Sequence, residues 1–205
     1  MRAPVENTAQ QVAEVSPQAA RKIIIVGNEA WRGGLSLAAR LACIDETVWY
    51  LCADNRFDPY AITRLAKIAK VNPTGVLRRI YIARAFTAFQ LAELVFRLDP
   101  KRLSGLVVIS GLCSSFFDED ISLSDAARLF YRVLWRVNTL ADNGLRLLIT
   151  QTDSPQNTRR QYLLNDLCRH AHVLLRMGNE RARLKAGTER QPALPFSNAT
   201  NTASI

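Results

Sequence analysis

Cysteine is scarce in this chain, and the few cysteines present are not paired. Four occur among 205 residues, at Cys43, Cys52, Cys113 and Cys168, and no C-x-x-C motif is formed. Three of the four fall within apolar runs. A disulfide scaffold or a cysteine-based zinc site needs paired, closely spaced cysteines. We therefore expect reduced thiols in the core of a cytoplasmic protein.

Long apolar runs are missing as well. No stretch approaches the ~20 residues that a membrane-spanning helix requires. Residues 1–18 are polar and lack the apolar centre of a secretory leader. The sequence therefore argues against secretion, and no membrane partner is expected.

Acidic residues are outnumbered by basic ones. Asp and Glu total 18 against 27 Lys and Arg, which gives a formal net charge of +9. Excess positive charge favours association with phosphate-rich or acidic partners. Weak, sequence-independent binding of nucleic acid is the first expectation, and an anionic membrane surface ranks behind it.

Composition divides the chain into three segments. Residues 1–20 are polar without apolar periodicity, and we expect a flexible N-terminal arm. Residues 21–185 have the length and apolar content of one domain. Residues 186–205 form a polar run with little to bury, which predicts a disordered tail.

Within residues 21–185, short apolar runs alternate with longer amphipathic ones. This alternation predicts an α/β fold with a mostly parallel central sheet flanked by helices. The nearly continuous apolar character of 23–27 predicts an interior position for that strand. The expected strands are 23–27, 47–52, 79–83, 104–110, 145–150 and 171–177, and the expected helices are 34–43, 59–71, 87–98, 123–142 and 160–169.

Two of these helices begin with recognisable capping chemistry. Asp58 is the N-cap residue of one helix, and Pro59 follows it at the first helical position. Ser122 precedes a helix with Asp125 in its first turn, where a carboxylate favours the positive end of the helix.

One glycine-containing turn has the layout of a phosphate-binding loop without its reactive residues. The expected strand at 23–27 is followed by a turn at 28–34 and then by a helix. This layout presents backbone N–H groups to phosphates. The nucleotide-hydrolysing motif G-x-x-x-x-G-K-[ST] also requires a lysine for the phosphates and a hydroxyl for Mg²⁺. Gly34 and Leu35 occupy those two positions here.

Taken together, these segments resemble the ATPase core of the RecA/RadA recombinase superfamily, closer to its archaeal and eukaryotic branch. The resemblance runs from about Lys22 to about Lys185. The stretches that carry it are Val48 to Pro59, Arg79 to Phe86 with Gln90 after it, Leu106 to Ile109, and Leu147 to Gln151. It implies a RecA-like P-loop NTPase-type core.

The resemblance also implies roles for single positions. Asp54 matches the glutamate that polarises the attacking water, and Ser110 replaces the Mg²⁺-associated aspartate. Both phosphate-handling motifs, Walker A and Walker B, are thus degenerate. The vestigial nucleotide-binding positions are Gly27, Arg32, Gly33, Gly34, Leu35, Ser36 and Ser110.

Loss of the lysine and of both Mg²⁺ ligands predicts negligible ATP hydrolysis, because phosphoryl transfer depends on positioning and on charge neutralisation. No residue is therefore assigned a catalytic role, and no cofactor is expected. Binding of ATP or another anion stays open, since Arg32 can supply charge and Ser36 a hydroxyl. Trp31 either fills the vacated phosphate pocket or anchors a partner.

Two groups of arginines are candidate nucleic-acid contacts. Arg128, Arg132 and Arg136 share one face of the helix at 123–142, which is either a solvated face or a contact surface. Arg159 and Arg160 lie where recombinases carry their second DNA-contacting loop, and they either grip phosphates or flank a helix start.

Two further patterns point away from these chemistries. The loop at 113–120, the counterpart of the first DNA-contacting loop of recombinases, contains three consecutive acidic residues that repel phosphate. Its two phenylalanines, Phe116 and Phe117, suit protein docking or a hydrophobic plug. His170 and His172 have no further ligands nearby in the sequence, and no metal site is predicted.

Three functions are compatible with these observations. The leading hypothesis is a non-catalytic RecA/RadA-like paralogue that assists DNA repair or recombination by binding DNA or a partner of the recombinase or DNA polymerase type. The second is an ATPase with an unorthodox phosphate loop. The third is a regulatory interaction protein without a nucleic-acid role. The sequence does not identify the partner, the pathway or the oligomeric state.

Overall fold

The computed structural model describes residues 21–153, 158–177 and 183–186. Most of the expected arm (1–20) and tail (186–205) lies outside the described residues. None of the helices in the described part of the chain is long and apolar enough to cross a lipid bilayer.

A twisted sheet of seven strands forms the centre of the molecule, in the order β3-β2-β4-β5-β1-β6-β7. Six strands are parallel, as the sequence predicts, and β7 pairs antiparallel with β6. The strands are β1 (Lys22–Val26), β2 (Val48–Cys52), β3 (Ile80–Arg84), β4 (Leu106–Ser110), β5 (Arg146–Gln151), β6 (Val173–Arg176) and β7 (Arg183–Ala186).

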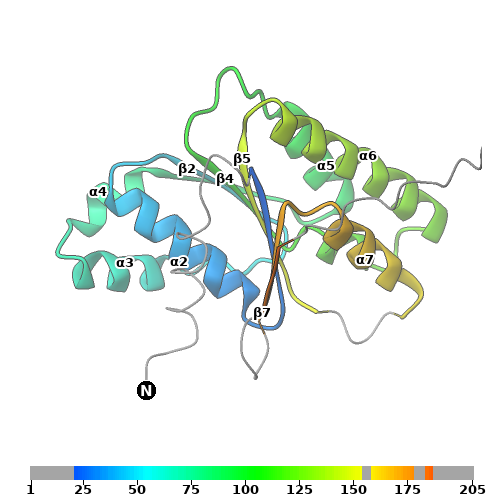
Figure 1. Cartoon of the computed structure of the whole chain (residues 1–205), viewed down its shortest axis with the longest axis horizontal. Coiled ribbons are helices and arrows are strands. Elements are labelled where there is room, and N and C mark those ends of the chain that lie inside the picture. The colour runs from blue at the N-terminus through cyan, green and yellow to red at the C-terminus, as the bar shows by residue number, and fades with distance from the viewer. Residues whose placement is uncertain (1–20, 154–157, 178–182, 187–205) are drawn as a thin grey trace, which may run out of the picture.

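The sheet is covered by helices on both faces (Figure 1). One layer holds α2 (Ala30–Cys43), α3 (Pro59–Ile68) and α4 (Pro73–Arg78), and the other holds α5 (Ala88–Arg97), α6 (Leu123–Asp142) and α7 (Gln161–Arg169). Because both faces of the sheet are covered, the central strands are buried on both sides. Every residue of β4 is buried, and β1 lies between β5 and β6. The prediction of an interior first strand is confirmed.

The two predicted caps are present. The Asp58 carboxylate accepts hydrogen bonds from the backbone N–H groups of Tyr60 and Ala61 at 2.9 and 3.1 Å. The Ser122 hydroxyl accepts one from the N–H of Asp125 at 3.1 Å. These bonds satisfy N–H groups that have no partner inside the helix. They explain why α3 begins at Pro59 and α6 at Leu123.

Three elements differ from the prediction. The helix expected at 59–71 ends at Ile68, and a second helix, α4, begins after Asn72, whose side chain caps it. The antiparallel strand β7 was not predicted, because its sequence is polar and basic. The third difference, an earlier start of α2, changes the predicted phosphate-binding loop.

Candidate functional site

The predicted phosphate-binding loop is nearly absent. Only Gly27, Asn28 and Glu29 separate β1 from α2, and the N–H of Ala30 already donates to the carbonyl of Gly27 at 3.0 Å. The prediction of a turn over 28–34 is therefore wrong. The reason is that Ala30 and the unbroken run of buried positions from Gly33 to Ala39 pack α2 against the sheet from its first turn.

Gly33 and Gly34 consequently lie within the helix and not in a loop. Both are buried. A Cβ atom on Gly34 would lie 2.6 Å from Cγ2 of Thr150, a contact that real side chains do not make. Gly34 is thus required because α2 approaches β5 closely. This explanation of the glycine involves no phosphate.

Gly27 also has a structural role. Its φ of +134° is unfavourable for other residues, and a Cβ there would lie 1.8 Å from the carbonyl oxygen of Met177. The N–H of Met177 donates to the carbonyl of Val26 at 2.7 Å. The chain after β6 therefore runs directly over the junction between β1 and α2.

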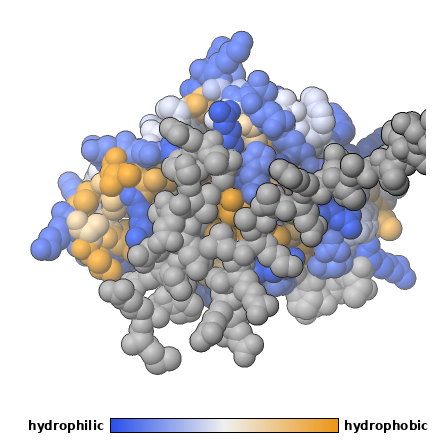
Figure 2. Space-filling view, viewed as in Figure 1, coloured by the Kyte–Doolittle hydropathy of each residue, from blue (hydrophilic) through white to orange (hydrophobic). Residues whose placement is uncertain are grey.

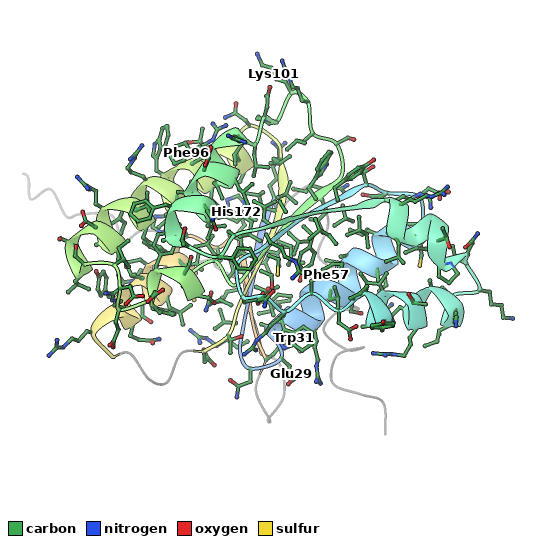
Figure 3. All side chains as sticks on the ribbon, turned by 180° about the vertical axis from the view of Figure 1, so that it is seen from behind. Glu29, Trp31, Phe57, Phe96, Lys101 and His172 are labelled. Atoms are coloured by element: carbon green, nitrogen blue, oxygen red, sulfur yellow. The ribbon has the colours of Figure 1, made fainter. Side chains whose placement is uncertain are left out.

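A carboxylate stands at the positive end of α2. Glu29 is the N-cap residue and forms an ion pair with Arg32 at 2.7 Å. The guanidinium of Arg32 also lies 5.1 Å from the ring centroid of Trp31. Figure 3 shows Glu29 and Trp31 at the end of the molecule where β1 runs into α2. A helix N-terminus attracts anions, and here the chain places its own anion at that end.

Arg32 was predicted to contribute charge to a bound anion, and it is engaged by Glu29 and Trp31. Leu35 and Ser36, two further vestigial positions, are 2 and 6% exposed. Neither side chain is presented from a loop. Trp31 is half-buried on the surface of α2.

Asp54 and Ser110 lie side by side at the carboxyl ends of β2 and β4. The Ser110 hydroxyl donates to Asp54 Oδ2 at 2.7 Å, and the Thr150 hydroxyl donates to Ser110 Oγ at 3.2 Å. Asp54 Oδ1 accepts from the N–H of Arg56 at 3.1 Å. The sequence did not predict this chain of hydroxyls, although serine and threonine at equivalent strand ends are its visible signal.

The carboxylate of Asp54 affects its buried neighbours. Burial raises the pKa of Tyr50, and the charge of Asp54 raises it further. Burial likewise raises the pKa of Cys52, with Asp54 again adding to the increase. Both groups are therefore neutral near pH 7. The arrangement holds Asp54 as an internal hydrogen-bond acceptor, which leaves little freedom to orient an attacking water.

The buried position of Arg160 contradicts the prediction that its side chain contacts phosphates at the surface. Arg160 is 6% exposed, and its guanidinium donates to the backbone carbonyls of Phe116, Asp118 and Ile121 at 2.6–2.7 Å. Arg160, which was predicted to contact phosphates, thus holds the acidic loop through these three hydrogen bonds, called the Arg160 clamp below. Buried carbonyl oxygens need donors, and a guanidinium supplies several at once. Its neighbour Arg159 is exposed.

The clamped loop packs inward through one of its aromatic residues. Phe116 is fully buried and contacts Phe130 edge to face, with ring centroids 5.5 Å apart. Of the two alternatives for this loop, the hydrophobic plug is confirmed for Phe116. The backbone N–H of Cys113 donates to Gln151 Oε1 at 2.8 Å, which joins the loop to the end of β5.

The three arginines of α6 share a face, but each has a neighbour in the fold. Arg128 forms an ion pair with Asp125 at 2.9 Å, and Arg132 lies 5.5 Å from the ring centroid of Phe96. Arg136 is half-buried and donates to the carbonyl of Leu98 at the end of α5 at 2.5 Å. Arg128 and Arg132 remain exposed, whereas Arg136 caps a helix.

No group of three or more His, Cys, Asp and Glu side chains suited to a metal occurs among the described residues. His170 Nδ1 lies 2.8 Å from the carbonyl oxygen of Asp166 at the end of α7. Within the described range the four cysteines are free, and Cys52 and Cys113 are buried.

Sequence comparison adds no relative to these observations. Neither a protein-family profile nor a curated protein sequence matches this chain.

Proposed function

We propose that this chain is a RecA/RadA-like protein without an ATPase cycle, which assists DNA repair or recombination by binding a partner protein at the β3 edge of its sheet. The observation that carries the proposal is the exposed apolar surface of that edge. The repair context follows from the resemblance of Val48 to Pro59 and Arg79 to Phe86 to the recombinase core.

The β3 edge is open and apolar. In the described part of the chain β3 pairs only with β2. Tyr81 and Ile82 are 53 and 45% exposed, and Phe86 and Phe89, which follow the strand, are 69 and 63% exposed. An exposed edge strand offers unpaired backbone groups to another strand, and such apolar edges mark aggregation or recognition sites.

The surface beside this edge is shaped to receive side chains. Tyr81 stacks on Trp49 with ring centroids 4.6 Å apart. A hollow of about 260 Å³ lies between this pair and Leu94 and Leu98 at the end of α5. An added strand places alternate side chains on this face, so that backbone bonds supply affinity and the hollow supplies specificity.

The non-catalytic part of the proposal is supported by the β1–α2 junction. Only three residues separate the end of β1 at Val26 from the start of α2, Glu29 is the N-cap residue of α2, and Asp54 accepts hydrogen bonds inside the fold. We expect no phosphate release from ATP, with or without single-stranded DNA, and no change when Asp54 is replaced by alanine. Turnover that Asp54→Ala abolishes would favour the ATPase alternative.

A protein partner is favoured over DNA because two of the five predicted DNA contacts are engaged inside the fold and an acidic loop lies beside them. Arg160 and Arg136 hold backbone carbonyls, and the loop at the first DNA-contacting position carries Asp118, Glu119 and Asp120, all exposed. Arg128, Arg132 and Arg159 remain exposed, but Arg128 is paired with Asp125 and Arg132 lies against Phe96.

The test is affinity capture from nuclease-treated extract of the native cell, with mass spectrometry of the retained proteins. Wild-type protein is expected to retain a recombinase or a DNA polymerase subunit. Ile82→Lys should lose it, because a charge at the edge opposes strand addition. The matched control is Ile44→Lys, which changes a more exposed isoleucine, 68% against 45%, just after the end of α2. Retention by the Ile82→Lys variant, or loss on nuclease treatment, would contradict the proposal.

A further inference from the structure

A groove with a volume of about 470 Å³ lies between α2 and α3. It is lined by Trp31, Leu35 and Arg40 from α2 and by Ala61, Arg64 and Ile68 from α3. Figure 2 shows apolar side chains gathered at the end of the molecule where α3 and α4 lie. The groove belongs to neither the β3 edge nor the predicted DNA contacts.

The floor and one rim of the groove are apolar. Leu35 is 2% exposed and forms part of the floor, whereas Ile68 is 77% exposed on the rim. Tyr60, one residue before Ala61, is 75% exposed. An isoleucine and a tyrosine this exposed beside an apolar hollow indicate a surface that a partner covers.

The charge around the groove is positive. Three arginines line it, at positions 32, 40 and 64, and the one carboxylate in the lining is Asp58. Arg32 is paired with Glu29, so the positive charge available to a ligand comes from Arg40 and Arg64. Asp58 is held by the backbone N–H groups at the start of α3, and its ion pair with Arg64 measures 3.6 Å. Arg40 is exposed and has no carboxylate partner among the described residues. The exposed Lys67 continues the positive charge along α3.

We propose that the α2–α3 groove binds an acidic amphipathic helix of a partner protein. Two neighbouring helices with an apolar furrow between them can pack a third helix, whose apolar residues at i, i+3 and i+7 enter the furrow. The span from Trp31 to Arg40 corresponds to roughly 14 Å of helix, which suits an occupant of about three turns. Acidic residues flanking the apolar stripe of that helix would meet Arg40, Arg64 and Lys67.

The same features disfavour nucleic acid as the occupant. A phosphate backbone needs exposed donors along its path, whereas the floor of this groove is aliphatic. The N–H groups at the start of α3 are taken by Asp58, and the start of α2 carries Glu29.

The test is fluorescence anisotropy with a labelled three-turn peptide that has leucines at i, i+3 and i+7 and glutamates on its other face. The full-length protein is expected to bind it at low salt and more weakly as salt rises. A peptide with lysines in place of the glutamates should not bind. Equal binding of both peptides, or of neither, would overturn the proposal.

Two variants locate the binding. Arg40→Glu should weaken it by about tenfold through reversal of a rim charge, and Ile68→Glu should weaken it at least as much. The matched controls are Arg102→Glu and Trp135→Glu, which change exposed side chains elsewhere. All four positions are exposed, so the variants should fold. Weakening by the controls alone would overturn the proposal.

A third variant separates this site from the β3 edge. Ile82→Lys should leave peptide binding unchanged, whatever its effect on a partner at the edge. A labelled single-stranded oligonucleotide serves as the competing probe. Two results together would assign the groove to nucleic acid and overturn the proposal. The oligonucleotide would bind the wild-type protein but not the Ile68→Glu variant, and neither peptide would displace it.

Discussion

At the scale of single residues, Gly34 decides how closely α2 lies on the sheet. A Cβ atom there would meet Cγ2 of Thr150 at 2.6 Å. Alanine favours helix over glycine by about 1 kcal/mol, but the clash with a packed side chain costs about 1–3 kcal/mol. We expect Gly34→Ala to lower the free energy of unfolding, measured by urea denaturation.

Two controls make this prediction specific. Gly75, in α4, has only Arg79 Nη1 within 4 Å of its hypothetical Cβ, at 3.4 Å. Gly75→Ala should therefore be neutral or stabilising. Thr150→Ser removes the obstructing methyl group and keeps the hydroxyl, so Gly34→Ala should cost less in that background. An equal cost in both backgrounds would contradict the steric explanation.

The adjacent arginines at 159 and 160 should behave differently. Arg160→Ala leaves three backbone carbonyls without their donor and should lower the free energy of unfolding by about 3 kcal/mol. Arg159→Ala, at an exposed position, should change it by less than about 0.5 kcal/mol. Thermal or urea unfolding followed by circular dichroism compares the two. Similar values for both variants would show that the clamp contributes little.

The same pair shows a limit of sequence analysis. Arg159 and Arg160 are identical in type and adjacent, and both follow a polar loop. Only the path of the chain around Phe116 and Ile121 buries one of them. Sequence identified a basic segment at this place, but the division between surface charge and internal clamp depends on contacts across more than 35 residues.

At the scale of elements, the start of α6 depends on one hydroxyl. The Ser122 side chain accepts from the N–H of Asp125 and donates to its carboxylate at 2.7 Å. Ser122→Ala should lower the free energy of unfolding by about 1 kcal/mol, because an N–H of the first turn loses its partner. Ser122→Asp keeps an acceptor and should retain most of the stability. Equal losses in the two variants would argue against capping as the cause.

Elements marked by a capping residue or by a periodic apolar pattern were predictable from the sequence, and elements without such a signal were not. The bounds 123–142 of α6 match the prediction because a serine cap and a long amphipathic pattern mark them. The start of α2 was misplaced because two glycines favour a loop in isolation. Packing of Ala30, Leu35 and Leu37 against the sheet overrides that preference. Polar β7 carries no periodic signal, so its pairing with β6 was not foreseeable.

At the scale of the whole molecule, the net charge of +9 predicts weak, salt-dependent binding of nucleic acid. The logarithm of the binding constant should fall linearly with that of salt concentration, as measured by anisotropy with a labelled single strand. Arg159→Ala should lower the slope by about one unit if its guanidinium contacts a phosphate. Arg102→Ala, another exposed arginine, is the control. Absence of binding at low salt would leave protein partners as the explanation of the charge.

The strand order also has a consequence for how this protein is made. Strand β1 is translated first, yet both of its neighbours, β5 and β6, begin only at Arg146 and Val173. Strands β2, β3 and β4 are complete by Ser110 and pair with one another. A growing chain of about 140 residues can thus form the three-stranded sheet of β2, β3 and β4, whereas the apolar strand β1 still lacks both of its pairing partners. Exposed strands of this kind aggregate or recruit chaperones. We therefore expect proteases to cleave ribosome-bound chains arrested at this length around Ile23–Val26. Chains released at full length should be protected from cleavage at the same residues.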